Sequence, residues 1–285
     1  MKRSHIPILI LVVLLIVLAV VLISRHCHRG GSEIPNVDLQ QTDIIEKHVF
    51  KGSMTDEPLY GYLKYDIHWP AAMEGYDLVP LQQALLTIMG SQDPNVTVKD
   101  FIKSYDNEIF PTDRWTQTSD TIPEEAYADP EKVIAAGYDM PYPPDGSIAA
   151  SLVYLDGERG LLCYKVETFL HAGCGLGACC NNSLDYIYYD LAKAKVVTFD
   201  DLFKQDANDH ILKLLKDAPT FANDVTPDLV QVKRLPSRWY LDDGSIYFIY
   251  DKYEIGCGAD GEISLGLPLD TLSTYLTPYA KQLFF

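Results

Sequence analysis

The chain has 285 residues and a formal net charge of −17, from 23 Lys and Arg against 40 Asp and Glu. Residues 1–30 hold four bases and no acid, so the other 19 bases face all 40 acids, a net charge of −21. Such a surface repels nucleic acid, whose phosphates need Lys and Arg, and it favours encounter with cationic partners. The alternative interpretation is that this charge only keeps the protein soluble.

An unbroken apolar run, IPILILVVLLIVLAVVLI, occupies residues 6–23. Its length is near the lower limit of the roughly 17–25 residues that cross a bilayer as a helix. Ser24 and Arg25 follow it, where a cleaved signal would have small residues. We therefore predict an uncleaved membrane helix. The residues before Cys27 do not resemble a lipobox, so lipidation of this cysteine is not expected.

The positive charges that flank this run are nearly balanced, with Lys2 and Arg3 before it and Arg25 and Arg29 after it. Only residues 1–5 precede the run, whereas the foldable chain follows it with a cysteine-rich segment that suits an oxidising compartment. We therefore expect a single-pass protein of the bacterial inner membrane, with its N-terminus inside and its ectodomain periplasmic or extracellular.

The rest of the chain alternates between strand and helix patterns. Residues 24–47 are polar and aperiodic, as in a stalk. Expected helices lie at 81–89, 97–109, 206–217 and from 271 onward, and expected strands at 60–69, 147–155, 160–170, 184–192, 245–250 and 262–267. Prolines fill the connection between residues 111 and 147. This pattern predicts an α+β fold, with antiparallel sheets and packed helices in two lobes after one N-terminal transmembrane helix.

The expected domain organisation follows from these elements. It comprises a cytoplasmic tip (1–5), a transmembrane helix (6–23), a stalk (24–47), an N-terminal lobe with its proline-rich connection (48–146) and a C-terminal domain (147–285).

Residues 190–204 (DLAKAKVVTFDDLFK) and 241–272 (LDDGSIYFIYDKYEIGCGADGEISLGLPLDTL) resemble the C-terminal domain of RsiV-type and PdaC-type bacterial envelope proteins. The segment LKYDIHWPA (63–71) is similar to the strand that opens such ectodomains, so the resemblance covers residues 58–276. It implies a binding ectodomain, which binds lysozyme in RsiV-type anti-sigma factors and precedes a peptidoglycan deacetylase domain in PdaC-type proteins. Neither a sigma-binding segment nor a deacetylase domain is expected here. The family's Gly-Gly-Ala-His turn is replaced by residues 171–180.

Catalytic motifs are not evident. Asp200 and Asp201 resemble the paired aspartates of a deacetylase but lack its two histidines, so we interpret them as an acidic first turn of a helix. The sequence has no Gly-x-Ser-x-Gly, His-Glu-x-x-His or phosphate-loop motif. We therefore predict no catalytic residue, no bound metal and no cofactor.

A glycine-rich loop carries most of the ectodomain cysteines. His171, Cys174, Cys179 and Cys180 are of the types that hold zinc, but adjacent cysteines do not easily face one ion, and an exported chain favours disulfides. The disulfide candidates are Cys163, Cys174, Cys179, Cys180 and Cys257. We expect two bridges, one of them joining Cys257 to the 174–180 loop.

The sequence thus predicts a membrane-anchored binding module of the cell envelope. Its expected partners are the membrane, through residues 6–23, and either lysozyme-like cationic proteins or peptidoglycan. The expected binding residues are His171, Gly173, Gly175, Tyr253 and Glu254. The alternatives are an enzyme that modifies cell-wall glycan through Asp200 and Asp201, and a structural envelope protein without a small ligand.

Overall fold

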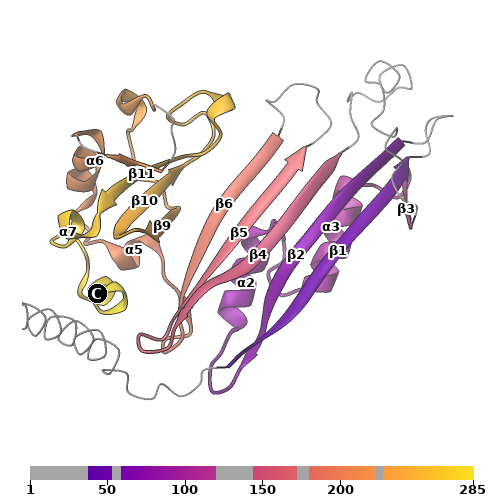
Figure 1. Ribbon diagram of the computed structural model, residues 1–285, viewed down its shortest axis with the longest axis horizontal. Helices are drawn as coiled ribbons and strands as arrows, with labels where there is room; N and C mark the ends of the chain where they lie inside the picture. The colour runs from indigo at the N-terminus through magenta and orange to yellow at the C-terminus, as the bar shows by residue number, and fades with distance from the viewer. Residues whose placement is uncertain (1–37, 53–58, 120–143, 172–179, 218, 223–226) are drawn as a thin grey trace, which may run out of the picture. The chain divides into compact units, whose positions relative to one another are not determined.

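A computed structural model describes residues 38–52, 59–119, 144–171, 180–217, 219–222 and 227–285. Asp38–Phe285 form one compact unit. The described residues form an α+β fold with mostly antiparallel sheets, as predicted (Figure 1). No helix among them is long and apolar enough to span a bilayer. The predicted span at residues 6–23 lies outside the described residues.

The first sheet has seven strands in the order β3-β1-β2-β4-β5-β6-β7 (Figure 1). All of its pairs are antiparallel except β2 with β4, which run parallel. Its strands are β1 (Leu39–Gly52), β2 (Leu59–Met73), β3 (Trp115–Thr118), β4 (Asp145–Asp156), β5 (Leu161–His171), β6 (Cys180–Asp190) and β7 (Lys195–Val196).

Two helices, α2 (Val79–Ile88) and α3 (Val98–Ile109), cover one face of this sheet (Figure 1). Alternate residues of a strand share a face, and on β2 the buried Leu63, Tyr65 and Ile67 form the covered face. The α3 helix begins as the sequence predicts, because the Thr97 side chain accepts a hydrogen bond from the Asp100 N–H at 3.1 Å.

The second sheet has four strands in the order β8-β11-β10-β9. These strands are β8 (Thr220–Phe221), β9 (Trp239–Asp242), β10 (Ser245–Tyr250) and β11 (Ile263–Pro268). Around them lie the helices α5 (Phe199–Leu202), α6 (Asn208–Asp217), α7 (Leu269–Leu272) and α8 (Pro278–Phe284), and the 3-10 turns η2 (Leu229–Gln231) and η3 (Gly258–Asp260).

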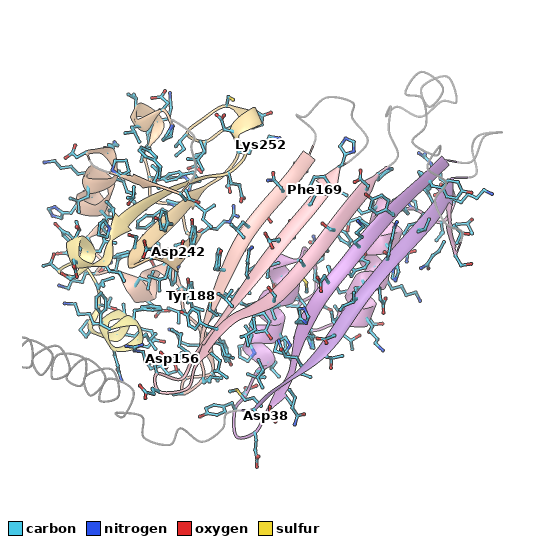
Figure 2. All side chains as sticks on the ribbon, viewed as in Figure 1. Asp38, Asp156, Phe169, Tyr188, Asp242 and Lys252 are labelled. Carbon is cyan, nitrogen blue, oxygen red and sulfur yellow. The ribbon has the colours of Figure 1, made fainter. Side chains whose placement is uncertain are left out.

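One hydrophobic core joins the second sheet to β5 and β6 of the first. Leu161, Cys163 and Tyr188 are buried in the same cluster as Trp239 and Phe248. Tyr188 lies on β6 (labelled in Figure 2). Its ring stacks on Trp239 with 4.4 Å between centroids, and its hydroxyl accepts a hydrogen bond from the Leu241 N–H at 2.7 Å. This packing fixes the second sheet against the edge of the first.

The structure differs from the predicted domain limits at two places. Strand β1 begins at Leu39, inside the segment predicted as a stalk to residue 47, because its polar residues pair with β2 over their whole length. The first sheet also crosses the boundary predicted between residues 146 and 147, since the parallel β2–β4 pairing joins strands from both sides of it. The N-terminal tip and most of the proline-rich connection lie outside the described residues.

Candidate functional site

A cleft of about 740 Å³ lies between the first sheet and the C-terminal helices. Helix α2 contributes Ala84 and Ile88 to its wall, and β6 contributes residues 185–187. The opposite wall comes from α5, α6 and the segment 233–239. The lining therefore combines residues that are more than 150 positions apart in the chain, such as Ala84 and Trp239. Its apolar residues are framed by charged ones at the rim, as is common in binding sites.

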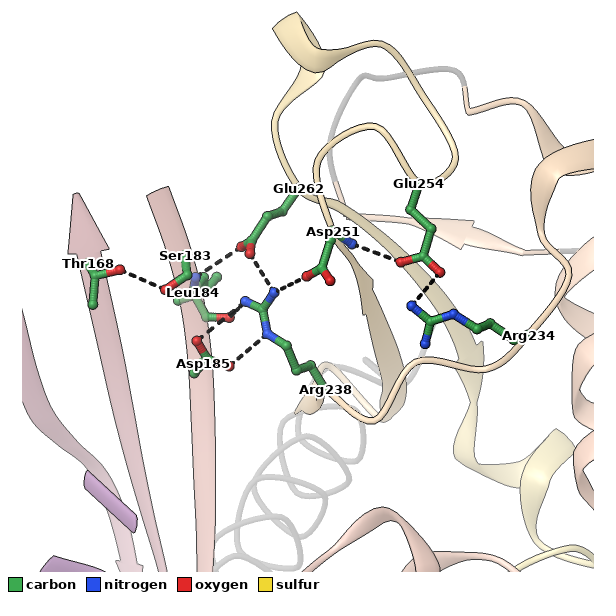
Figure 3. Close-up of polar contacts among 9 residues, drawn as sticks. All are labelled: Thr168, Ser183, Leu184, Asp185, Arg234, Arg238, Asp251, Glu254 and Glu262. Atoms are coloured by element: carbon green, nitrogen blue, oxygen red, sulfur yellow. Dashed lines mark hydrogen bonds and ion pairs between the residues drawn. The ribbon is translucent and has the colours of Figure 1, made fainter. Parts of the chain in front are cut away.

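Arg238 forms the centre of an ion-pair network at one end of this cleft (Figure 3). Its Nε lies 2.7 Å from Asp185 Oδ1 of β6. Its Nη1 lies 2.7 Å from Asp251 Oδ1 and 2.5 Å from Glu262 Oε1, at the ends of β10 and β11. A single side chain thus ties the edge of the first sheet to two strands of the second.

The same network closes the free edge of β6. Arg238 Nη2 donates to the Leu184 carbonyl at 2.6 Å, and Glu262 Oε2 accepts the Leu184 N–H at 2.9 Å (Figure 3). Both backbone groups of Leu184 are therefore satisfied by side chains rather than by another strand. An edge strand with unpaired backbone groups invites pairing with other chains, so this arrangement protects the sheet.

The electrostatics of the network favour a permanently charged arginine. Burial by itself lowers the pKa of Arg238, but the hydrogen bond to Glu262 and the charges of Asp185 and Glu262 together raise it above its ordinary value. One guanidinium faces three carboxylates, so the network keeps a net negative charge.

Two further carboxylates stand on the rim of the cleft. Asp200 and Asp209 are exposed, and neither has a hydrogen-bond or ion-pair partner within the described part of the chain. Arg234 is also on the rim but pairs with Glu254 at 2.9 Å. The cleft and its network hold six carboxylates (Asp185, Asp200, Asp209, Asp251, Glu254, Glu262) and three cations (Lys233, Arg234, Arg238). The site is therefore electronegative.

The predicted binding residues Tyr253 and Glu254 lie beside this network. Glu254 accepts the Asp251 N–H at 3.2 Å and pairs with Arg234, so it shapes the turn after β10. Tyr253 is 64% exposed and has a positive φ of 70°. Its ring lies so close to Gly258 that a Cβ there would overlap it, which explains the glycine at this position.

The other predicted binding residues belong to a different sheet. His171 ends β5, and its Nδ1 lies 3.1 Å from Asp145 Oδ1 of β4. Gly173 and Gly175 lie outside the described residues. His171 therefore lies on a different sheet from the turn that carries Tyr253 and Glu254, and the shared binding site of these residues stays a prediction.

Asp201, one of the two carboxylates in the enzyme alternative, has a structural role. Its Oδ2 accepts the Thr198 N–H at 2.9 Å, and its Oδ1 accepts Lys195 Nζ at 2.7 Å. Burial acts to raise the pKa of Asp201, but the bonds from Lys195 and Thr198 outweigh it and lower that pKa. The carboxylate completes a capping box at α5. This confirms the acidic first turn that the sequence predicts.

The cysteines that the structure describes carry free thiols. Cys163 is buried on β5, and burial raises the pKa of its thiol to about 12, which makes it a poor nucleophile. Cys257 is exposed and its thiol is free, so the structure does not show the bridge expected between it and the 174–180 loop. Cys174, Cys179 and the side chain of Cys180 lie outside the description. Among the described residues, no group of three His, Cys, Asp or Glu side chains could hold a metal ion.

The comparisons with known proteins match this fold to a family of unknown function. Residues 200–270 match the family model described as "Protein of unknown function (DUF3298)". These residues include most of α5, α6, η2 and the strands β8–β11, which build most of the cleft's second wall, together with Arg238 and two of its three carboxylate partners, Asp251 and Glu262. The match confirms the resemblance to a bacterial module of unknown function that the sequence predicts.

Solved structures extend the likeness to most of the chain. A DUF3298-family protein from Bacteroides fragilis NCTC 9343 has a TM-score of 0.60 and 18% identity, covering 88% of this chain and 98% of that one. A DUF3298-family protein from Pseudomonas aeruginosa PAO1 has a TM-score of 0.52 and 15% identity, covering 85% and 96%. At these identities the likeness shows the fold alone. Comparison with curated proteins found no significant match.

Sequence reasoning missed the Arg238 network and the cleft. Arg238 stands between Pro236 and the strand β9, in a segment without hydrophobic periodicity. Its partners Asp185, Asp251 and Glu262 lie 53, 13 and 24 positions away. The local sequence, KRLPSRWYLDD (233–243), does not single out Arg238 and does not identify partners at such separations.

Proposed function

We propose that this protein is a membrane-anchored, non-catalytic binding module of the bacterial cell envelope, and that its cleft recognises a cationic segment of a protein partner. The anchor is the apolar run at residues 6–23, which places the folded unit outside the cytoplasm. A protein of the lysozyme kind is the partner class suggested by the RsiV-type resemblance. Its basic surface complements a chain whose residues after 30 carry a net charge of −21.

One observation carries this proposal: the exposed carboxylates of Asp200 and Asp209 line an electronegative cleft and have no partner among the residues that the structure describes. The carboxylates of the Arg238 network already have partners, but these two are open to an incoming Lys or Arg. The apolar lining between them, which includes Ile88 and Leu212, suits the aliphatic stems of such side chains. The charged and the apolar residues of the cleft therefore both suit a Lys or Arg side chain of a partner.

The same geometry weighs against Asp200 and Asp201 as the catalytic pair of a glycan-modifying enzyme. General acid–base catalysis on a glycosidic bond needs two carboxyl groups free to exchange protons. Asp201 is held by Lys195 and Thr198, so Asp200 lacks the neighbour that the enzyme alternative requires. The structural alternative, without a ligand, accounts for Asp200 and Asp209 only as acidic residues in the first turns of α5 and α6, and not for their shared place in the lining of the cleft.

Binding of lysozyme tests this proposal. With the full chain in detergent micelles, biolayer interferometry should show lysozyme binding at an ionic strength of about 10 mM that weakens strongly at about 150 mM, because the Debye length falls from about 30 Å to 8 Å. The double variant Asp200→Asn/Asp209→Asn should bind about five- to tenfold more weakly, mainly through a slower association rate.

A matched variant separates the cleft from the overall charge. Glu108→Gln/Glu158→Gln also removes two negative charges, but from exposed positions that do not line the cleft. It should leave the affinity for lysozyme nearly unchanged. The proposal fails if lysozyme does not bind at low ionic strength. It also fails if the two double variants weaken binding equally, since the cleft would then have no special part in recognition.

A further inference from the structure

The face of the first sheet opposite α2 and α3 carries a cationic strip, defined by Lys47, Lys51 and Lys64. Lys47 of β1 and Lys64 of β2 are directly opposite each other in the strand register. Both ammonium groups approach the ring of Tyr62, at 4.6 and 5.3 Å from its centroid. Further along, Lys51 Nζ lies 5.9 Å from the ring of Tyr60, its own cross-strand neighbour. The strip thus combines ammonium groups with aromatic rings.

The charge pattern of the strip is unfavourable for the isolated chain. Like charges directly opposite each other on an antiparallel pair are destabilising. None of the three ammonium groups forms an ion pair with a carboxylate anywhere in the described ranges, although the chain has 40 acids for 23 bases. Asp145, in register with Tyr62, already accepts from the Tyr62 hydroxyl at 3.4 Å and contacts His171, and Asp66, two residues from Lys64 on the same face of β2, lies 3.4 Å from His68 Nε2. The strip therefore presents unneutralised positive charge on an acidic protein.

The surface next to the strip continues its polar and aromatic character. In register with Lys64 across the sheet lie Ser147, Phe169 and Asn182. Phe169 is partly exposed on β5 (Figure 2). A sheet face with small residues between aromatic rings offers contacts for ring-shaped groups, and serine and asparagine offer hydrogen bonds to hydroxyls.

We propose that this face binds an anionic glycan, whose carboxylates pair with Lys47 and Lys64 and whose sugar rings lie on Tyr62 and Phe169. Charge complementarity selects an anion, and the aromatic rings beside the lysines favour a ligand with apolar ring faces over a simple acidic peptide. Nucleic acid is disfavoured because the rest of the surface repels a dense row of phosphates. This site is distinct from the cleft and goes beyond the function proposed for it.

Oligogalacturonate, a carboxylated glycan, is the probe for this site, and calorimetric titration of the full chain is the measurement. The wild type should bind it, with an affinity that falls as salt rises. Lys47→Gln/Lys64→Gln should reduce that affinity at least tenfold, since both cations at the ring of Tyr62 are lost. Lys99→Gln/Lys103→Gln, which removes two exposed lysines of α3 on the covered side of the sheet, should bind like the wild type.

Two further measurements make the result decisive. The unfolding midpoint of Lys47→Gln/Lys64→Gln should equal or exceed that of the wild type, because a like-charge pair is removed, and its affinity for lysozyme should not fall. Failure of oligogalacturonate to bind the wild type, or equal losses in both lysine pairs, would overturn the proposal. Polyglutamate bound as tightly as oligogalacturonate would overturn the glycan assignment and identify an acidic peptide as the ligand.

Discussion

Arg238→Met is expected to lower the free energy of unfolding by about 3–5 kcal/mol, because it leaves a set of partly buried carboxylates without their cation. The side chains of Asp185 and Glu262 are only 15% and 13% exposed, so water cannot fully replace the guanidinium. The Leu184 carbonyl also loses its donor. Chemical denaturation of the full chain in detergent, followed by tryptophan fluorescence, measures this loss.

Arg234→Met provides a matched control four residues away. This arginine is 62% exposed and pairs with one carboxylate, so its loss should cost less than about 1 kcal/mol. Removing a second charge should also restore part of the stability, so Arg238→Met/Glu262→Gln is expected to be more stable than Arg238→Met. Equal effects of the two arginine substitutions would show that the network contributes no more than a surface ion pair.

Asp106→Ala is expected to produce the second large loss, about 3–4 kcal/mol. The Asp106 carboxylate is 9% exposed and accepts from the Tyr65 hydroxyl at 2.8 Å, while its other oxygen lies 2.7 Å from His48 Nδ1. Burial raises the pKa of Tyr65 and the Asp106 charge raises it further, so this hydroxyl stays protonated and donates. Without Asp106, the buried Tyr65 hydroxyl and the partly buried His48 Nδ1 lose their shared partner where α3 packs on β1 and β2.

Glu46→Ala is the matched control, because it removes the carboxylate that contacts the other ring nitrogen of His48. Glu46 Oε2 lies 2.9 Å from His48 Nε2, but its side chain is 50% exposed, so water can replace it and the loss should be below about 1 kcal/mol. Thermal or chemical unfolding of both variants gives the comparison. An Asp106→Ala variant as stable as Glu46→Ala would mean that the buried carboxylate is not a stabilising contact of α3.

Local signals in the sequence were sufficient to place most helices and several strands. Thr97 and Asp100 marked the start of α3, and the apolar spacing after Leu81 marked α2, because caps and helical periodicity depend on neighbours within a few residues. A similar local signal identified Asp200 and Asp201 as acidic residues in the first turn of α5. The sequence therefore predicts an element correctly where interactions between neighbouring residues determine its structure.

Long-range pairing could not be predicted in the same way. The sequence of β1 from Gln40 to Asp43 is polar and lacks alternation, since most of these side chains are exposed, and only its partner β2 makes it a strand. The parallel pairing of β2 with β4 connects segments on either side of the proline-rich stretch. The cleft could not be predicted for the same reason, because its walls are brought together by tertiary packing and not by any motif.

The central claim, that a cationic protein partner binds in the cleft, is tested most directly by photocrosslinking with lysozyme. A benzophenone side chain would replace Asn208, an exposed residue of the cleft lining, or Asn107, an exposed residue of α3 outside it. We predict a crosslinked product with the probe at residue 208 and little or none at 107, and a loss of that product in Asp200→Asn/Asp209→Asn. Equal crosslinking at both positions, or none at residue 208 while lysozyme is bound, would contradict the account.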